Sequence, residues 1–316
     1  MSSKKFAFAL LMAVGCGQSS PNATVETPSQ TAVPAAPPAA PPAAPPVSAA
    51  LRSPAASTGP GLVYEGRSEF SHFKIYDRAS MRYLMFVRDN GDEVVESALD
   101  LASPDELAIE YTRMMFVSHL FRPVQTRVLI VGLGGGSMIR FLRRFFPSIA
   151  VTVVEIDPAV VRAAHDYFGI ADGPNLRIVT EDGFSFIRAS GDSYDVIYMD
   201  AFLKPSEATD HEGAPLNMQT LAFLRDLQRR LVPGGLFVVN INIQSGTAQD
   251  IQTLRQAFPQ VYLFESAGNL IVAGSIATAP VSDDTLRSNG QQIDRQGRYG
   301  FSFASLVDLR TDRSSF

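Results

Sequence analysis

The stretch VLIVGLGGGS at residues 128–137 decides the fold, because it joins an apolar strand to a glycine-rich turn. A helical pattern, MIRFLRRFF, follows at 138–146, and the next apolar run, VTVVEID at 151–157, carries a carboxylate near its end. Continuous apolar strands that alternate with helices are typical of a parallel sheet buried on both faces. The stretch therefore predicts an α/β fold with a Rossmann-like sheet.

The same alternation continues toward the carboxyl terminus, so we expect one Rossmann-like nucleoside-binding domain over residues 101–275. Its further elements are predicted to be a helix at 158–168, a strand at 176–182, a short helix, a strand at 194–200, a helix at about 218–231, a strand at 236–242, a helix at about 248–257 and strands at 261–266 and 269–274. Residues 276–316 are polar and weakly patterned, and we interpret them as a C-terminal tail.

On the amino side, residues 61–100 consist of short alternating runs separated by turn signals such as Asp89-Asn90-Gly91. Alternation of this kind predicts a small antiparallel β-element. A helix should follow, with Ser103 as its N-cap and Pro104 in its first turn, and it should end before Pro123.

The first sixty residues are predicted to lie outside the fold. Two lysines, an apolar run and a small-residue step lead into Cys16, which is the layout of a secretory signal over residues 1–16. The Cys16 junction resembles the lipobox of bacterial lipoproteins, in which the cysteine is acylated. Residues 17–60 are rich in Pro and Ala, and a segment with so little apolar surface cannot offset the entropy of ordering it. We expect a disordered linker there.

Composition excludes several function classes. The formal net charge of −5 gives no basic field for a nucleic acid partner. The chain has one cysteine and four scattered histidines, so neither a disulfide framework nor a zinc site is expected, and no metal is predicted.

The glycine-rich turn is the first candidate binding element. Glycines at 132, 134 and 136 let the backbone approach a ligand closely, and the helix that follows offers free N–H groups. Glu155 ends the next strand, where a carboxylate can accept both ribose hydroxyls of a nucleoside. The spacing of Gly132, Gly134 and Gly136 suits a nucleoside without pyrophosphate, as in enzymes that use S-adenosylmethionine.

Two aspartates end the following strands. Asp182, with Gly183 behind it, can accept from the exocyclic amine of an adenine and can also cap the short helix, and we expect both roles. Asp200 lies at the carboxyl edge, where open α/β sheets bind ligands, and is the candidate general base or amine-orienting group. Its alternative role is to cap the next loop. Asp157 with Pro158 is predicted to be a helix cap without chemistry.

The polar loop LKPSEATDHEGAPL at 203–216 is long enough to cover the site. Asp210, His211 and Glu212 lie in it and could meet substrate, although solvated loop charge is the simpler interpretation.

Taken in order, five segments resemble the spermidine synthase family of aminopropyltransferases over roughly residues 62–275. The segments are DELAIEYTRMMFVSHLF (105–121), VLIVGLGGGSMIR (128–140), VVEIDPAVV (153–161), EDGFSFI (181–187) and YDVIYMDAF (194–202). The resemblance implies a methyltransferase-type sheet, decarboxylated S-adenosylmethionine as donor and an amine as acceptor. It also implies that Glu155 holds ribose, Asp182 adenine, Tyr111 the substrate, and that Asp200 is catalytic.

The chain departs from the family pattern at the amine half of the site. Gly135 stands where the family has an aspartate for the donor's propylamine, so an Asp restored there should raise aminopropyl transfer if the remaining site is intact. Phe70-Ser71 replace a Tyr-Gln pair, Thr112 replaces a His or Gln, and Leu203 replaces a second aspartate. The nucleoside half is retained.

The first prediction is therefore a spermidine synthase-family transferase that takes an adenosyl sulfonium donor, decarboxylated S-adenosylmethionine or S-adenosylmethionine, and a small-molecule amine acceptor. One alternative is an S-adenosylmethionine-dependent methyltransferase. Another is a catalytically inactive envelope binding protein on the same fold. A homodimer is kept open as the assembly.

The N-terminal signal predicts a cell-envelope lipoprotein that faces the periplasm and touches the membrane only through lipid on Cys16. Adenosyl sulfonium donors are made in the cytosol, which conflicts with export of an enzyme that uses one. A cytoplasmic location, with the signal a misread start, is the alternative.

Overall fold

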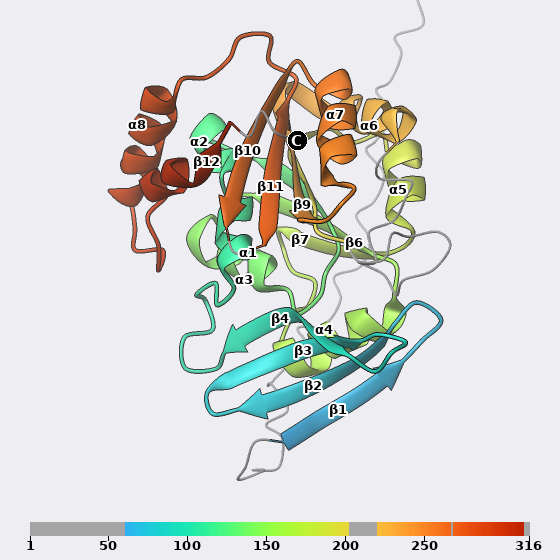
Figure 1. Ribbon diagram of the computed structural model, residues 1–316. Coiled ribbons are helices and arrows are strands. Elements are labelled where there is room, and N and C mark those ends of the chain that lie inside the picture. The colour runs from blue at the N-terminus through green and yellow to red at the C-terminus, as the bar shows by residue number, and fades with distance from the viewer. Residues whose placement is uncertain (1–60, 202–219, 267, 313–316) are drawn as a thin grey trace, which may run out of the picture. The chain divides into compact units, whose positions relative to one another are not determined.

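The computed structural model describes residues 61–201, 220–266 and 268–312, which form two β-sheets and the helices around them (Figure 1). The larger sheet has eight strands in the order β12-β10-β11-β9-β8-β5-β6-β7. Its central strands are β5 (Arg127–Val131), β6 (Ala150–Glu155), β7 (Leu176–Thr180), β8 (Tyr194–Met199) and β9 (Leu231–Asn242). These five strands are parallel to their neighbours in that group, as the alternation predicted.

Two antiparallel strands extend the sheet beyond β9. They are β10 (Gln260–Ser266) and β11 (Asn269–Ser275), which form a hairpin, and β11 pairs with β9.

Both faces of the large sheet are buried, because successive strand residues pack into different core clusters. In β5, Val128 and Ile130 join one cluster, whereas Leu129 and Val131 join the other. The first cluster includes α3 (Ser137–Phe145) and α4 (Pro158–Phe168), and the second includes α5 (Gly183–Ala189), α6 (Leu221–Gln228) and α7 (Thr247–Ala257). Burial on two sides explains the uninterrupted apolar runs in the sequence. The predicted Rossmann-like fold is confirmed.

The smaller sheet is antiparallel, as predicted for residues 61–100. Its strands, in spatial order, are β1 (Gly61–Arg67), β2 (His72–Arg78), β3 (Met81–Val87) and β4 (Glu93–Asp100). Phe73, Ile75 and Leu84 are buried in the same core cluster as α3 and α4. The last strand, β4, contacts α3 and so brings this sheet to the glycine-rich turn.

The predicted helix start at Ser103 is wrong. Residues 103–106 form a turn in which the Glu106 N–H donates to the Ser103 carbonyl (3.1 Å). Helices begin only at α1 (Glu110–Met115) and α2 (Ser118–Phe121). Leu107 is buried before α1, and the Arg113 guanidinium donates to its carbonyl (2.8 Å). Tertiary burial of Leu107 thus outweighs the local capping signal.

The interpretation of residues 276–316 as a polar tail is also wrong. These residues contain α8 (Asp283–Asp294), the 3-10 helix η2 (Ala304–Leu309) and β12 (Arg310–Thr311), which pairs with β10. Phe303 is fully buried, and its ring lies 5.6 Å from the ring of His119 and 5.1 Å from that of Tyr299. A few large side chains, widely spaced in polar sequence, therefore complete the core.

Several sequence predictions concern positions outside the described residues: the signal and linker at 1–60 with Cys16, and the loop at 203–216 with Leu203, Asp210, His211 and Glu212. Among the helices that the structure does describe, none combines the length and apolar character needed to cross a bilayer.

Candidate active site

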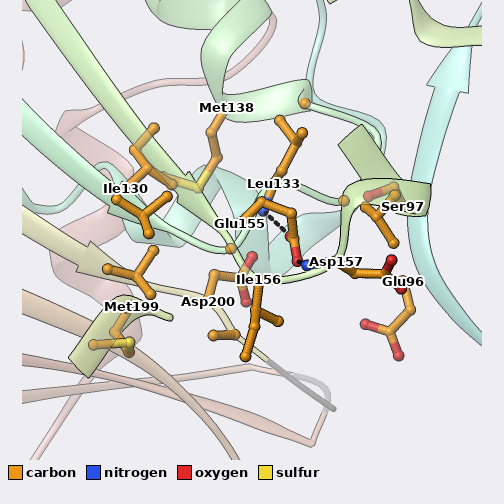
Figure 2. A pocket seen from close by; sticks show the side chains of 18 of the residues that line it. Glu96, Ser97, Ile130, Leu133, Met138, Glu155, Ile156, Asp157, Met199 and Asp200 are labelled. Carbon is orange, nitrogen blue, oxygen red and sulfur yellow. Dashed lines mark hydrogen bonds between the residues drawn. The ribbon is translucent and has the colours of Figure 1, made fainter. Parts of the chain in front are cut away.

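A pocket opens at the carboxyl ends of the central strands β5, β6 and β8, and β4 and α1 complete its wall (Figure 2). It encloses about 1090 Å³ of empty space, counting the part open to solvent. Open α/β sheets bind ligands at this edge, and the size suits a small molecule. Every site residue predicted between positions 111 and 200 lines this pocket.

Glycine is required in the turn that forms the pocket floor. Gly132 has φ +100°, and a Cβ atom there would lie 2.0 Å from the Asp200 carbonyl oxygen. Gly136 has φ +69°, and a Cβ atom there would lie 2.4 Å from Ile170. Left-handed backbone and close packing both exclude larger residues. Gly134 and Gly183 also line the pocket.

Glu155, the last residue of β6, is held by the turn itself. Its Oε2 accepts from the Leu133 N–H and its Oε1 from the Asp157 N–H, both at 2.9 Å, and the first contact is drawn in Figure 2. Burial raises the pKa of the Glu155 carboxyl, and the backbone donors oppose that rise. Each carboxylate oxygen keeps lone-pair capacity for a further donor, such as a ribose hydroxyl.

Asp157 is the predicted cap of α4, and its Oδ1 accepts from the Ala159 N–H (2.7 Å). Its Oδ2 accepts from the hydroxyls of Ser68 (2.6 Å) and Ser71 (2.5 Å) in the β1–β2 turn. Ser71 is one of the positions that depart from the family pattern, and its hydroxyl links the small sheet to the end of β6 through Asp157.

Asp182 is the N-cap of α5, because its Oδ1 accepts from the Ser185 N–H (2.9 Å). The capping role expected from the sequence is confirmed. The side chain also lines the pocket, so its second oxygen can meet a ligand.

Asp200 directly follows β8, and two side chains hold its carboxylate. Asn240 on β9 donates to Oδ1 (3.1 Å), and the Tyr111 hydroxyl on α1 donates to Oδ2 (3.2 Å). Asn269 on β11 in turn donates to the side-chain Oδ1 of Asn240 (2.9 Å), which fixes the direction of the Asn240 side-chain amide. Burial raises the pKa of Asp200, and the two hydrogen bonds oppose the rise.

Tyr111 joins two walls of the pocket, since its hydroxyl also lies 3.5 Å from the main-chain oxygen of Glu96. Burial first, and then the charges of Asp200 and Glu96, raise the pKa of Tyr111, so it stays a neutral donor. Its neighbour Thr112 is buried and donates its hydroxyl to the Ile109 carbonyl (2.6 Å).

Asn240 and Glu96 were not among the site residues predicted from the sequence. Burial, and secondarily the charge of Asp200, raises the pKa of Glu96 to about 8. Two adjacent polar residues, Glu96 and Ser97, interrupt the alternation of β4, and this interruption is the signal that could have singled out Glu96. Asn240 lies within an apolar strand, and a polar residue in such a run was the available sign.

The packing around Gly135 argues against the expected gain from an aspartate at position 135. The Gly135 N–H donates to the Ser97 hydroxyl (2.9 Å). A Cβ atom on Gly135 would lie 2.9 Å from the Ser97 Cβ and 3.0 Å from the Phe168 ring. Ser97 of the small sheet and Phe168 of α4 therefore fill the space that a side chain at position 135 would need.

The pocket is acidic. Among its described lining residues the ionisable groups are one phenol and five carboxylates: Tyr111, Glu96, Glu155, Asp157, Asp182 and Asp200. No three metal-ligating side chains in the described part of the chain converge on one point. The charge of the lining favours a cationic ligand.

Comparisons with known proteins place this pocket in context. The profile of the "Spermine/spermidine synthase domain" matches residues 105–271. A polyamine aminopropyltransferase from Vibrio vulnificus is 28% identical over 237 residues, which cover 73% of this chain and 77% of that protein.

Two solved structures share the fold. A spermidine synthase in complex with the transition-state analogue AdoDATO superposes with a TM-score of 0.61 at 19% identity, covering 78% of this chain and 84% of that one. Human methyltransferase-like protein 13 in complex with SAH gives a TM-score of 0.56 at 24% identity, covering 62% and 96%.

Proposed function

Because the chain belongs to the spermine/spermidine synthase family, we propose that it transfers an aminopropyl group from decarboxylated S-adenosylmethionine to an amine acceptor of the polyamine type. The observation that carries the proposal is Asp200, held by Tyr111 and Asn240 in a pocket that also contains Glu155. The similarity to a polyamine aminopropyltransferase supports the reaction class.

The nucleoside of the donor binds at the carboxyl ends of β6 and β7. Glu155 accepts the ribose hydroxyls with the lone pairs that Leu133 and Asp157 leave free. The free oxygen of Asp182 accepts from the adenine amine. The turn at Gly132, Gly134 and Gly136, together with Gly183, lets the backbone approach the nucleoside closely.

The reaction is a displacement at carbon. The lone pair of the acceptor nitrogen attacks the propyl carbon bonded to the sulfonium, the C–S bond breaks, and methylthioadenosine leaves as a neutral thioether. The alkylated acceptor nitrogen is then a positively charged ammonium with one proton more than the neutral product amine, and Asp200 accepts that proton. A carboxylate whose pKa is raised is a better base near neutral pH than an ordinary one. Holding both substrates in line supplies most of the rate.

The acidity of the pocket favours the decarboxylated donor over S-adenosylmethionine. Both carry a sulfonium and an ammonium, but S-adenosylmethionine adds a carboxylate, which the acidic lining of the pocket disfavours. Methyl transfer is the second candidate, because the turn carries Gly135 in place of an acidic residue and the fold is shared with methyltransferase-like protein 13.

The test is to incubate the full chain with a linear diamine and either donor, and to quantify nucleoside products by chromatography. We expect methylthioadenosine from the decarboxylated donor. S-adenosylhomocysteine formed from S-adenosylmethionine would instead establish methyl transfer. Tight binding of the donor without either product would establish the inactive binding protein.

We also propose that the protein is a cell-envelope lipoprotein, anchored by lipid on Cys16 and facing the periplasm. Because adenosyl sulfonium donors are made in the cytosol, aminopropyl transfer at this location requires that the donor reach the envelope. The basic and apolar pattern of residues 1–16 and the Pro- and Ala-rich segment 17–60 support this location. Labelling with a clickable fatty acid should mark the wild-type chain and not Cys16→Ser. An unlabelled cytosolic product would overturn the proposal and favour a downstream start.

A further inference from the structure

A β-bulge in β4 directs Glu96 into the pocket. Ser97 pairs with Leu84 and Val95 pairs with Met85, so Glu96 is an extra residue without a partner on β3. Regular strands send consecutive side chains to opposite faces, yet Glu96 and Ser97 both line the pocket. Bulges re-aim side chains in this way and are common beside active sites.

The Glu96 carboxylate is left without a hydrogen-bond donor among the described residues, although its neighbours are all engaged. The Ser97 hydroxyl accepts from Gly135, and the Tyr111 hydroxyl donates to Asp200. The nearby charges that act on Glu96 are Asp200, which opposes its ionisation, and Arg88, which favours it by a smaller amount. A carboxylate in such surroundings is stabilised by a cation brought by the ligand.

The position of Glu96 in the pocket indicates which cation of the ligand it binds. Figure 2 shows Glu96 and Ser97 together on one side of the pocket, with Met199 on the other. Ser97 contacts the glycine-rich turn at Gly135, so Glu96 borders the donor side of the pocket. Asp200, beside Tyr111, is left for the acceptor amine.

We propose that Glu96 selects the donor: its carboxylate binds the terminal ammonium of the aminopropyl arm and repels the carboxylate that S-adenosylmethionine carries on the same arm. The inference rests on the proposed function, because it assumes an adenosyl sulfonium ligand. It also explains how the site can bind the donor's ammonium without an aspartate at position 135. Packing of Ser97 and Phe168 closes that position to a side chain, and the bulge in β4 supplies a carboxylate in its place.

The test is calorimetric binding of three ligands to the full chain: methylthioadenosine, which lacks the arm, decarboxylated S-adenosylmethionine and S-adenosylmethionine. We expect the wild type to prefer the decarboxylated donor. Glu96→Gln should weaken that donor roughly 10-fold to 100-fold, the range for a hydrogen bond to a charged group. It should leave methylthioadenosine unchanged and improve S-adenosylmethionine.

Two further variants complete the design. Glu96→Asp keeps the charge and should keep the preference for the decarboxylated donor. Glu93→Gln, on the same strand but paired with Lys74 at the surface, should change none of the three affinities.

The possible failures are distinguishable. If Glu96→Gln binds all three ligands as the wild type does, the inference is wrong and the proposed function stands. If Glu96→Gln loses methylthioadenosine as well, the defect is general and the inference is again wrong. If the wild type binds none of the three, the proposed function fails and the inference fails with it.

Discussion

The two ends of the pocket are built in different ways. The end proposed to bind the nucleoside, here called the nucleoside end, consists of Gly132, Gly136, Glu155 and Asp182. The end proposed to bind the amines, here called the amine end, consists of Glu96, Tyr111 and Asp200, with Asn240 bonded to Asp200. At the nucleoside end, the partners of Glu155 lie 22 and 2 residues away in the chain. At the amine end, the partners of Asp200 lie 89 and 40 residues away. One end is made by local sequence and the other by tertiary contacts.

This difference fits the resemblance described from the sequence, in which the departures from the family pattern fall at the amine end. The nucleoside end depends on a strand, a turn and a helix cap, and its residues Gly132, Gly136 and Asp182 are required by the local backbone. The amine end draws on four separate elements, so a carboxylate absent from one element can be provided by another. If the two ends are independent, a substitution at one end should leave the function of the other end unchanged.

The largest effect is expected from Asp200→Asn. Loss of the general base should lower the rate of aminopropyl transfer about 10²- to 10⁴-fold. Methylthioadenosine should still bind, because the nucleoside end is untouched. Steady-state rates and calorimetric affinities measure the two ends separately, and Asp192→Asn, at the surface beside Arg127, is the matched control. An equal loss of nucleoside binding would show that the ends are not separable.

Glu155→Gln, in contrast to Asp200→Asn, should weaken binding of the nucleoside. The amide nitrogen that replaces one oxygen would face an N–H donor of Leu133 or Asp157. Methylthioadenosine should bind roughly 10-fold to 100-fold more weakly, as expected when a charged acceptor is lost. Glu106→Gln, on the exposed turn before α1, is the control. Unchanged nucleoside affinity in Glu155→Gln would remove Glu155 from the site.

Gly135→Asp tests whether the amine end can return to the family pattern. Because the new Cβ would press on Ser97 and the Phe168 ring, we expect a loss of about 1–3 kcal/mol in the free energy of unfolding, as for other overpacked sites. No gain in aminopropyl transfer should accompany it. Denaturant titration and initial rates check both statements, and a faster enzyme of normal stability would contradict them.

Asn240→Ala removes one hydrogen bond from Asp200 without touching the nucleoside end. That bond lowers the pKa of Asp200, so its loss should move the acidic limb of the pH–rate profile to higher pH. We expect the rate at neutral pH to fall about 10-fold, the value of one hydrogen bond to a charged group. A reduced rate with an unmoved pH profile would indicate that Asn240 is only structural.

A last effect, of a different kind, concerns stability and pH. The pKa of Glu96 is about 8 in the folded state and 4.5 when unperturbed, so between these values the folded chain holds a proton that the unfolded chain has released. Stability should therefore fall as pH rises through this window, by at most about 1.4 kcal/mol per pH unit for one group. Glu96→Gln should flatten the slope, which denaturant titrations at pH 5 to 8 would measure. Equal slopes of stability against pH in the wild type and Glu96→Gln would contradict a raised pKa of Glu96.

Most of the large sheet could be predicted from the sequence, because apolar runs, glycine turns and helix caps report local structure. The caps at Asp157 and Asp182 were predicted correctly for this reason. The helix start at Ser103 was not, because the burial of Leu107 overrode the capping signal. Residues 276–316 were predicted to be a tail because most of them are polar, but burial of the Phe303 ring joins this segment to the core.

The sequence by itself determined the Rossmann-like sheet and the nucleoside end, since period, glycine sterics and capping act over a few residues. Only the tertiary structure decided the amine end. The bulge at Glu96, the hydrogen bonds from Tyr111 and Asn240 to Asp200, and the closure of Gly135 by Phe168 each depend on elements brought together by folding. Contacts of this kind leave no regular spacing in a sequence, because the core packing that positions them is spread along the whole chain.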